Sequence, residues 1–296
     1  MPKSTVAPLD GEASFIPRCT CDILLCVMNM HGSSTPLRTV TRALLLLSTL
    51  VFVACDPGPV DWRETRELGA APPPESRLVV EDFSLPRFES EPRPDAPPPA
   101  NACPGSLNYA RMDGTQWHRV WWQPQPDGRA ALFTARSPDA GATWDAPILV
   151  DSSDRGRTGC DRLPPAVAAD SLTRFVHVVF YMRAPNGDGV WYAHSMDDGA
   201  TWHGQAGLIY GDDPARADVA AEGELVVVGY ENPNAAEQAI GLAISRDGGH
   251  TFLPRLTVTS GSGAASAPRV GARRPGFGVA WKERNGWLAR VGVMRE

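Results

Sequence analysis

An eight-residue pattern recurs three times in the C-terminal two thirds of the chain. The copies occupy residues 137–144, 195–202 and 245–252, align without gaps, and read S-x-D-x-G-x-T followed by Trp or Phe. Their first residues are 58 (137 to 195) and 50 (195 to 245) residues apart. A motif that returns at such an interval indicates supersecondary units that stack on one another. This periodicity constrains the fold more than any other feature of the sequence.

Other segments recur with the same period. Alternating strands that end in an aromatic residue are expected at 119–122, 178–181, 227–230 and 278–281. Runs of small residues precede three of them, at 165–170, 217–222 and 267–272. Outward strands are expected at 146–150 and 256–258. Four strands in about 50 residues match the size and order of a β-propeller blade, whose crowded centre suits small side chains. No segment has helical periodicity. We therefore predict an all-β fold of about four four-stranded blades over residues 101–296.

The repeated pattern resembles the Asp-box, or BNR repeat, of the sialidase-like β-propellers. In each box the Asp is suited to accept backbone N–H bonds within a turn. The Gly is suited to a positive φ, and the final aromatic residue to packing between blades. The residues concerned are Asp139, Gly141 and Trp144, Asp197, Gly199 and Trp202, and Asp247, Gly249 and Phe252. In that family the boxes lie on the face opposite the active site, so the resemblance implies a structural role for them.

The number of repeats departs from the family pattern. Enzymatic sialidases have six blades, which at this blade size need about 300 residues. Residues 101–296 hold four repeats, and the fourth lacks both its box and its outer strand. A propeller closes its ring or leaves an exposed sheet edge. We expect the strand-like segment 77–83 to return as the missing outer strand. The alternative is a partial propeller that closes by dimerising.

The N-terminal region has the features of an export signal. Residues 43–54 are apolar and uncharged and follow Arg38 and Arg42. Such a run is too short to span a bilayer, which takes about 20 residues, and is typical of a secretory signal. Cys55 comes next and resembles the lipidated Cys of a bacterial lipoprotein, although Phe52 stands where Leu is usual. The alternatives are a plain signal peptide or a buried apolar helix.

These features divide the chain into three parts. Residues 1–54 are expected to be a leader and signal, and 55–100 a Pro-rich stalk, since 57–100 contain 11 prolines. Residues 101–296 are the expected propeller. The leader carries Cys19, Cys21 and Cys26, a spacing that suggests half of a metal site with nothing nearby to complete it. The expected location is the bacterial cell envelope, in the periplasm or at the cell surface, with the membrane reached through the lipid on Cys55.

Two cysteines remain in the predicted propeller, Cys103 and Cys160, each just before the first strand of a blade. In an oxidising compartment a disulfide between them is the default expectation. The net charge of −6 offers no basic surface for nucleic acid. His177 and His194 lie in adjacent expected strands and could meet a metal, but buried or edge histidines are commoner. We therefore expect no metal and no cofactor.

The family resemblance directs the search for a site to the face opposite the boxes. A retaining sialidase uses three arginines on the sugar carboxylate, a Tyr–Glu nucleophile pair and an Asp acid/base. The residues here that can share that face are Arg162, Arg183, Arg269, Tyr230, Glu231 and Asp161. Adjacent strand residues point to opposite sides, which makes Tyr230 and Glu231 a poor pair. The family's early Arg-Ile-Pro motif is missing, and its nearest match, residues 162–164, lies in the second repeat.

Three functions compete. The first is a non-catalytic surface module that binds a glycan or an envelope protein through aromatic loop ends, because aromatic faces stack on sugars and anchor proteins. The aromatic residues in question are Trp121, Trp122, Tyr181, Tyr230, Trp281 and Trp287, for which packing between blades is the plainer explanation. The second is an exo-α-sialidase-type glycoside hydrolase, and the third an envelope assembly scaffold. No G-x-S-x-G, H-E-x-x-H or phosphate-loop motif points to another chemistry.

Overall fold

The computed structural model describes residues 58–69, 71–73, 75–259, 264–284 and 286–296. The expected leader, signal segment and lipidated Cys55 lie outside these residues, as do Cys19, Cys21 and Cys26. Pro57 to Glu296 form one compact unit. Within the described ranges every regular element is a β-strand, and no helix suited to crossing a bilayer is found there.

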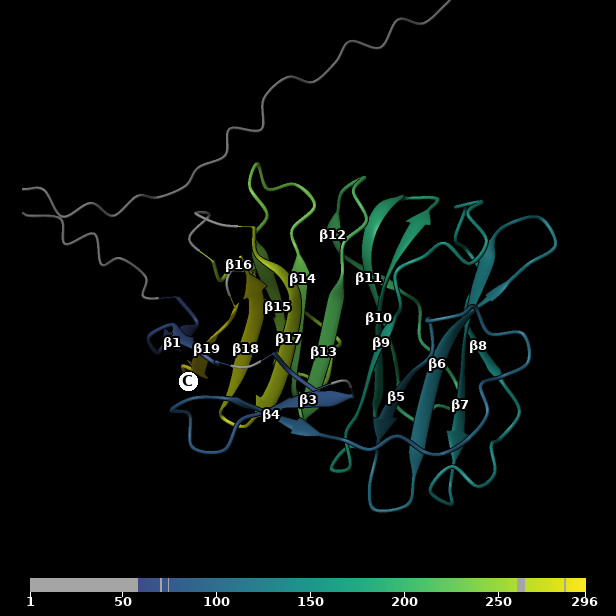
Figure 1. The fold of residues 1–296 in the computed structure, drawn as a ribbon, viewed down its shortest axis with the longest axis horizontal. Helices are drawn as coiled ribbons and strands as arrows, with labels where there is room; N and C mark the ends of the chain where they lie inside the picture. Colours follow the sequence, from purple (N-terminus) through teal and green to yellow (C-terminus); the bar gives the residue numbers. More distant parts are fainter. Residues whose placement is uncertain (1–57, 70, 74, 260–263, 285) are drawn as a thin grey trace, which may run out of the picture. The chain divides into compact units, whose positions relative to one another are not determined.

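The first three blades are antiparallel sheets of four strands in sequence order (Figure 1). The first blade contains β5 (Asn108–Arg111), β6 (Trp117–Pro124), β7 (Ala130–Ser137) and β8 (Ile148–Asp151). The second contains β9 (Ala166–Ala169), β10 (Val176–Ala184), β11 (Gly187–Ser195) and β12 (Ala206–Tyr210). The third contains β13 (Ala217–Glu222), β14 (Leu225–Glu231), β15 (Ile240–Ser245) and β16 (Leu256–Thr257). The predicted fold class is confirmed.

The fourth blade combines both ends of the compact unit. Its strands are β17 (Ser266–Arg273), β18 (Gly276–Glu283), β19 (Gly286–Met294) and β1 (Val60–Trp62), and β2 (Arg66–Glu67) also pairs with β19. Val60 lies opposite Met294 in the antiparallel register. The Trp62 ring meets the Phe277 ring edge-on at 5.5 Å, which packs the added strand into the blade. A strand from the N-terminal part of the chain therefore completes the fourth blade, as expected, although it is not the strand that was predicted.

The segment predicted for that role, 77–83, is used elsewhere. Its first residues form β3 (Ser76–Val79), which pairs only with β4 (Arg87–Ser90). Figure 1 shows this hairpin lying across the direction of β17 and β18, which it contacts. Leu78 and Val80 are each 5% exposed. A Cβ at Gly271 would overlap the Leu78 carbonyl oxygen. The prediction was wrong because these apolar side chains cover the inner part of the fourth blade rather than its outer edge.

The residues after β4 continue onto the first blade. Glu91 forms an ion pair with Arg111 at 3.7 Å, and an Arg93 guanidinium nitrogen donates to the Asn108 side-chain oxygen at 3.3 Å. Pro94 packs against Gly141. The hairpin and the segment behind it therefore occupy the place between the fourth blade and the first. The stalk predicted for 55–100 is replaced, over its described residues, by four strands, because the prolines fall between strands and leave the apolar residues free to pack.

The hydrophobic core lies between neighbouring blades. One cluster joins the first and second blades, one the second and third, and one the third and fourth. Three aromatic strand ends belong to these clusters: Trp122 has no exposed surface, and Tyr230 and Trp281 are 2% exposed. Trp121 is also fully buried and lies against the Phe133 ring. Tyr181 and Trp287 are half-buried, with the Tyr181 hydroxyl donating to the Asp212 carbonyl at 2.8 Å. Most of these side chains build the core, and Trp287 is the one of the six that lines the central cavity described below.

The three Asp-boxes share one hydrogen-bond pattern. The Ser hydroxyl donates to the Asp carboxylate and accepts the Gly N–H at 2.8 Å in every copy. The Asp also accepts the Thr N–H at 2.8, 2.8 and 2.9 Å and the Thr hydroxyl at 2.6 Å. Hydrogen bonds from Thr143 and Thr201 lower the pKa of Asp139 and Asp197. The box aspartates are thus committed to closing their own turns.

The box glycines also fit against the preceding structural unit. Gly141, Gly199 and Gly249 have φ values of 92°, 83° and 93°. A Cβ at Gly249 would overlap the hydroxyl of Tyr192 in the second blade, and one at Gly141 would overlap Pro94. A Cβ at Gly199 would lie 3.3 Å from the His118 ring in the first blade. Each box therefore fixes its own turn and fits its blade against the preceding unit.

We expect Gly249→Ala to lower the free energy of unfolding by about 2–4 kcal/mol, since it adds left-handed backbone strain to a steric overlap. Gly204→Ala is the matched control, because Gly204 follows the second box and has no atom within 4 Å of its Cβ position. Urea denaturation of both variants measures the difference. Equal losses for the two substitutions would contradict the fit described for the third box.

We also expect a fragment of residues 101–296 to lose cooperative folding, whereas residues 58–296 retain it. Val60, Leu78 and Val80 are at most 5% exposed. Removing three such side chains from the core costs roughly 5–9 kcal/mol, as much as the whole stability of many domains. Thermal unfolding followed by circular dichroism compares the fragments, and equal melting temperatures would refute ring closure by the N-terminal segment.

Candidate functional site

A central cavity of about 520 Å³ lies among the inner strands. Its walls come from β5, β9, β13 and β17, one strand from each blade, and from β3 and the residues after β4. Much of the wall is the small-residue sequence predicted for the blade centres, including residues 166–169 and 217–221. Because these side chains are short, the inner strands leave space along the axis instead of filling it. The cavity has the volume of a small-molecule site, for which 300–1,000 Å³ is usual.

The cavity lining carries more positive than negative side chains. The cations are Arg77, Arg93, Arg111, Arg216 and Arg269, and the carboxylates are Glu75, Glu91 and Asp218. The chain as a whole has a net charge of −6. A positive excess at the centre of an acidic chain favours an anionic occupant, because enclosed charges of one sign concentrate the opposite ion.

Most of these charges already face partners. Arg269 lies 3.3 Å from Asp218, and also donates to the Ser76 carbonyl oxygen. Burial raises the pKa of Asp218, and Arg269 opposes that shift. Glu91 lies 3.7 Å from Arg111 and 3.8 Å from Arg77. Among the described residues Arg216 has no side-chain hydrogen bond or ion pair, so its guanidinium is the cation of the lining most available to a ligand.

Tyr230 and Glu231 have separate structural roles. Tyr230 is 2% exposed, its ring lies against Gly241, and burial raises its pKa to about 12. Glu231 accepts the Arg216 N–H at 2.9 Å and the Ala267 N–H at 2.8 Å. It therefore holds the starts of β13 and β17 together at the cavity. The structure does not bring the two residues together as a nucleophile pair.

The candidates of the second repeat lie in or beside the loop of residues 151–163. Arg162 donates to the carbonyls of Gly159 at 2.8 Å and Gly156 at 2.5 Å and forms an ion pair with the fully buried Asp154. Its guanidinium lies 5.4 Å from the centre of the Trp122 ring. Arg162 thus organises its own loop.

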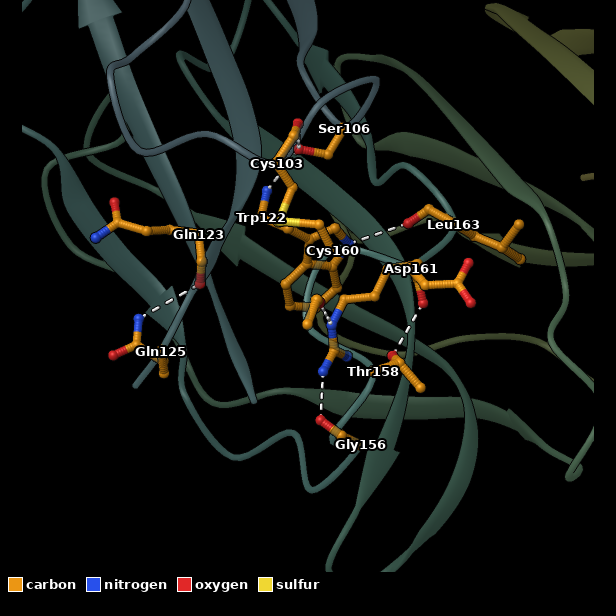
Figure 2. The surroundings of a disulfide bond; sticks show 12 residues. Cys103, Ser106, Trp122, Gln123, Gln125, Gly156, Thr158, Cys160, Asp161 and Leu163 are labelled. Atoms are coloured by element: carbon orange, nitrogen blue, oxygen red, sulfur yellow. Dashed lines mark hydrogen bonds between the residues drawn. A yellow bond between two sulfur atoms is a disulfide. The ribbon is translucent and has the colours of Figure 1, made fainter. Parts of the chain in front are cut away.

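The other two candidates of this repeat are no closer to a shared site. Arg183 is exposed and lies 3.5 Å from Asp188. The backbone carbonyl of Asp161 accepts the Thr158 hydroxyl at 2.9 Å, as Figure 2 shows. Of the six sequence candidates, only Arg269 lines the cavity. The structure therefore does not gather these six candidates into one site.

The predicted disulfide is present between Cys103 and Cys160 (Figure 2). It joins the segment before β5 to the loop before β9, and Trp122 lies beside it. The Trp122 indole N–H donates to the Leu163 carbonyl at 3.0 Å, and the Cys103 N–H donates to the Trp122 carbonyl at 2.7 Å. The bond therefore fastens the first blade to the second at the end of the blades away from the boxes. Such a bond is typical of chains that fold in an oxidising compartment.

The described residues contain no group of three or more His, Cys, Asp or Glu side chains arranged to hold a metal ion. His177 and His194 lie directly opposite each other on β10 and β11, as their sequence positions suggested. Their rings are nearly parallel, with centres 6.4 Å apart. They stack and do not point toward a common centre.

The cavity arginines at positions 77, 93, 111 and 216 were not among the candidate site residues named from the sequence. Arg111 ends β5, the inner strand of the first blade, which lacks the small-residue signature of the other three. The position of β5, just before an aromatic strand, was the available signal. Arg93 was assigned to the expected stalk and Arg77 to the expected returning strand 77–83, so their place at the cavity depends on the long-range packing of the N-terminal segment.

No protein-family model matches the chain, and no curated protein matches it. Similar solved structures include a NanB sialidase mutant of Streptococcus pneumoniae, with 13% identity, a TM-score of 0.39, and coverage of 65% of this chain and 31% of that one. A subtype N11 neuraminidase-like protein from a flat-faced bat isolate has 8% identity, a TM-score of 0.42, and coverage of 64% and 48%. A xylan β-1,4-xylosidase from Bacillus halodurans has 14% identity, a TM-score of 0.39, and coverage of 80% and 53%. The chain spans about a third to a half of the length of these proteins.

We expect the double substitution Cys103→Ser, Cys160→Ser to lower the free energy of unfolding by about 2–4 kcal/mol, the usual effect of a bond that closes a loop of this size. The two cysteines are 57 residues apart. Guanidinium denaturation of the oxidised chain and of the variant, both without reductant, measures the loss. A variant as stable as the parent would show that the loop of residues 151–163 is held without the disulfide.

Proposed function

We propose that the chain is an exported, non-catalytic binding module that takes an acidic glycan into its central cavity. The observation that carries the proposal is the lining itself, five arginines against three carboxylates in a chain of net charge −6. A guanidinium binds a carboxylate through two parallel N–H bonds, so arginines suit a sugar that bears a carboxylate. The cavity volume of about 520 Å³ is large enough for a mono- or disaccharide end.

The bonding of the candidate catalytic residues supports a binding role over hydrolysis. A general acid or nucleophile must reach the reacting atoms of its substrate. Tyr230 is enclosed in the core, and both oxygens of the Glu231 carboxylate accept backbone N–H groups. Asp218 lies in the cavity, and its Oδ2 accepts the Val270 N–H and faces the Arg269 guanidinium. Tyr230, Glu231 and Asp218 are therefore engaged in core packing or in bonds between strands, while Tyr109, Glu75 and Glu91 also line the cavity.

The proposed location is the bacterial cell envelope. Residues 43–54 support export, and a lipid on Cys55 would hold the module at a membrane. The disulfide between Cys103 and Cys160 is consistent with that compartment. A surface module of this kind would attach the bacterial cell to an acidic polysaccharide or glycoprotein.

We expect the full chain to bind carboxylate-bearing oligosaccharides, to ignore neutral ones of equal length, and to bind more weakly as salt is raised. Arg216→Ala should weaken the affinity about tenfold, the loss of one charge-assisted contact. Arg66→Ala is the matched control, because Arg66 is an exposed arginine on β2, outside the cavity lining. Isothermal titration calorimetry measures both. Equal affinities for the two variants, or equal binding of neutral sugars, would contradict the proposal.

A further inference from the structure

Four of the six histidines gather where the second blade meets the third. His177 and His194 come from β10 and β11, His203 follows the second Asp-box, and His250 lies within the third. The His194 ring centre is 5.3 Å from that of His203 and 5.0 Å from that of His250. The ring of Phe175 lies 6.3–6.4 Å from those of His177, His194 and His250. Imidazoles of two blades thus form one cluster.

The inner two imidazoles have little access to water. His177 has no exposed surface, and His194 is 8% exposed. The His177 Nδ1 is hydrogen-bonded to the Tyr192 hydroxyl at 2.7 Å. The Nε2 atoms of His177 and His194 are buried without a hydrogen-bond partner. A proton added to either ring would place a charge where nothing accepts its N–H, and that is costly in a protein interior.

The surrounding carboxylates offer little compensation. Asp170, just after β9, is the carboxylate whose charge favours the protonated form of His177. It already accepts the Thr173 N–H at 2.8 Å and the Thr173 hydroxyl at 2.7 Å. Asp247 of the third box acts on His194, but accepts from Ser245 and Thr251. Burial raises the pKa of Asp247, but the hydrogen bonds from Thr251 and Ser245 outweigh burial and lower that pKa to about 2. The other neighbours that titrate are imidazoles and the Tyr192 phenol, so a proton on one ring repels a proton on the next.

The physical consequence has a definite sign. Burial, with His194 nearby, lowers the pKa of His177 to about 3. Burial, with His250 and His203 nearby, lowers the pKa of His194 to about 4. An unfolded chain protonates both near pH 6.5. Between those values the unfolded state binds more protons, so the folded state loses stability as the pH falls from about 6.5 toward 4.

The cluster also sits against the main contact between these two blades. Tyr192 stacks on His177 and His194, meets Phe252 of the third box at 5.0 Å, and fills the space beside Gly249. The strands β9 and β13 of the same two blades form adjacent walls of the cavity. A charge within the cluster therefore acts on the joint that positions both walls.

We propose that the buried imidazoles of His177 and His194 make the joint between the second and third blades an acid-sensitive switch, which holds while both rings are neutral and loosens when opening of the joint lets them take up protons. The switch is independent of which ligand the cavity binds, and it is tested without one.

The test is urea denaturation of the full chain at pH 7.5, 6.0 and 5.0. Because two imidazoles gain protons on unfolding, they alone raise the unfolding equilibrium constant about 100-fold for each pH unit near pH 5. His194→Phe keeps a ring in the stack and removes one titrating group. We therefore expect the unfolding equilibrium constant of this variant to rise only about tenfold for each pH unit near pH 5. Phe175→Leu is the control, because it removes a ring of the same cluster and should lower stability equally at every pH.

Two results would overturn the proposal. One is a pH dependence that His194→Phe leaves unchanged relative to the parent chain. The other comes from the unmutated chain and so does not depend on the variants folding: a ¹⁵N NMR titration in which all imidazoles protonate near pH 6.5 while the chain stays folded. Retention of at least two neutral imidazoles below pH 5, with faster hydrogen exchange at residues 245–252, is the expected result.

Discussion

The ring of blades depends on the join between its last blade and its first. Strands at an open edge expose unpaired N–H and C=O groups. Here β1 completes the fourth blade by pairing with β19, the β3–β4 hairpin contacts β17, and the residues after β4 contact the first blade. The cavity, the inner arginines and the seating of the first Asp-box against Pro94 all follow from that join. The proline-rich segment is consequently part of the cavity wall.

Packing between blades explains why conspicuous residues are unavailable for chemistry. The chain has only four blades. Aromatic residues at the strand ends, such as Trp122, Tyr230 and Trp281, fill the space between neighbouring blades. Polar residues are committed likewise: the box aspartates close turns, Glu231 holds two inner strands, and Arg162 organises the disulfide-linked loop. The charges that remain near the axis are mainly arginines, which is the basis of the proposed recognition of acidic sugars.

Local pattern predicted much of this structure, and long-range pairing limited the rest. The boxes, the aromatic strands and three of the inner strands were visible because each repeats with the blade period. The disulfide followed from having two cysteines in the predicted propeller. The pairing of Val60 with Met294 spans almost the whole unit and leaves no local signal, so a different segment was expected at that edge. The site was harder to predict than the fold, because the orientation of a single side chain, such as that of Tyr230, decides it.

A cavity that binds an acidic sugar without cleaving it should retain the ligand and form no product. One NMR sample containing the full chain and an α-linked sialyl-lactose tests both parts, since line broadening of the ligand reports binding and new free-sugar signals report hydrolysis. We expect saturable broadening that Arg216→Ala weakens, with no released sugar after a day. Release of free sialic acid by the purified chain, abolished by Glu231→Gln but not by Arg66→Ala, would contradict this expectation.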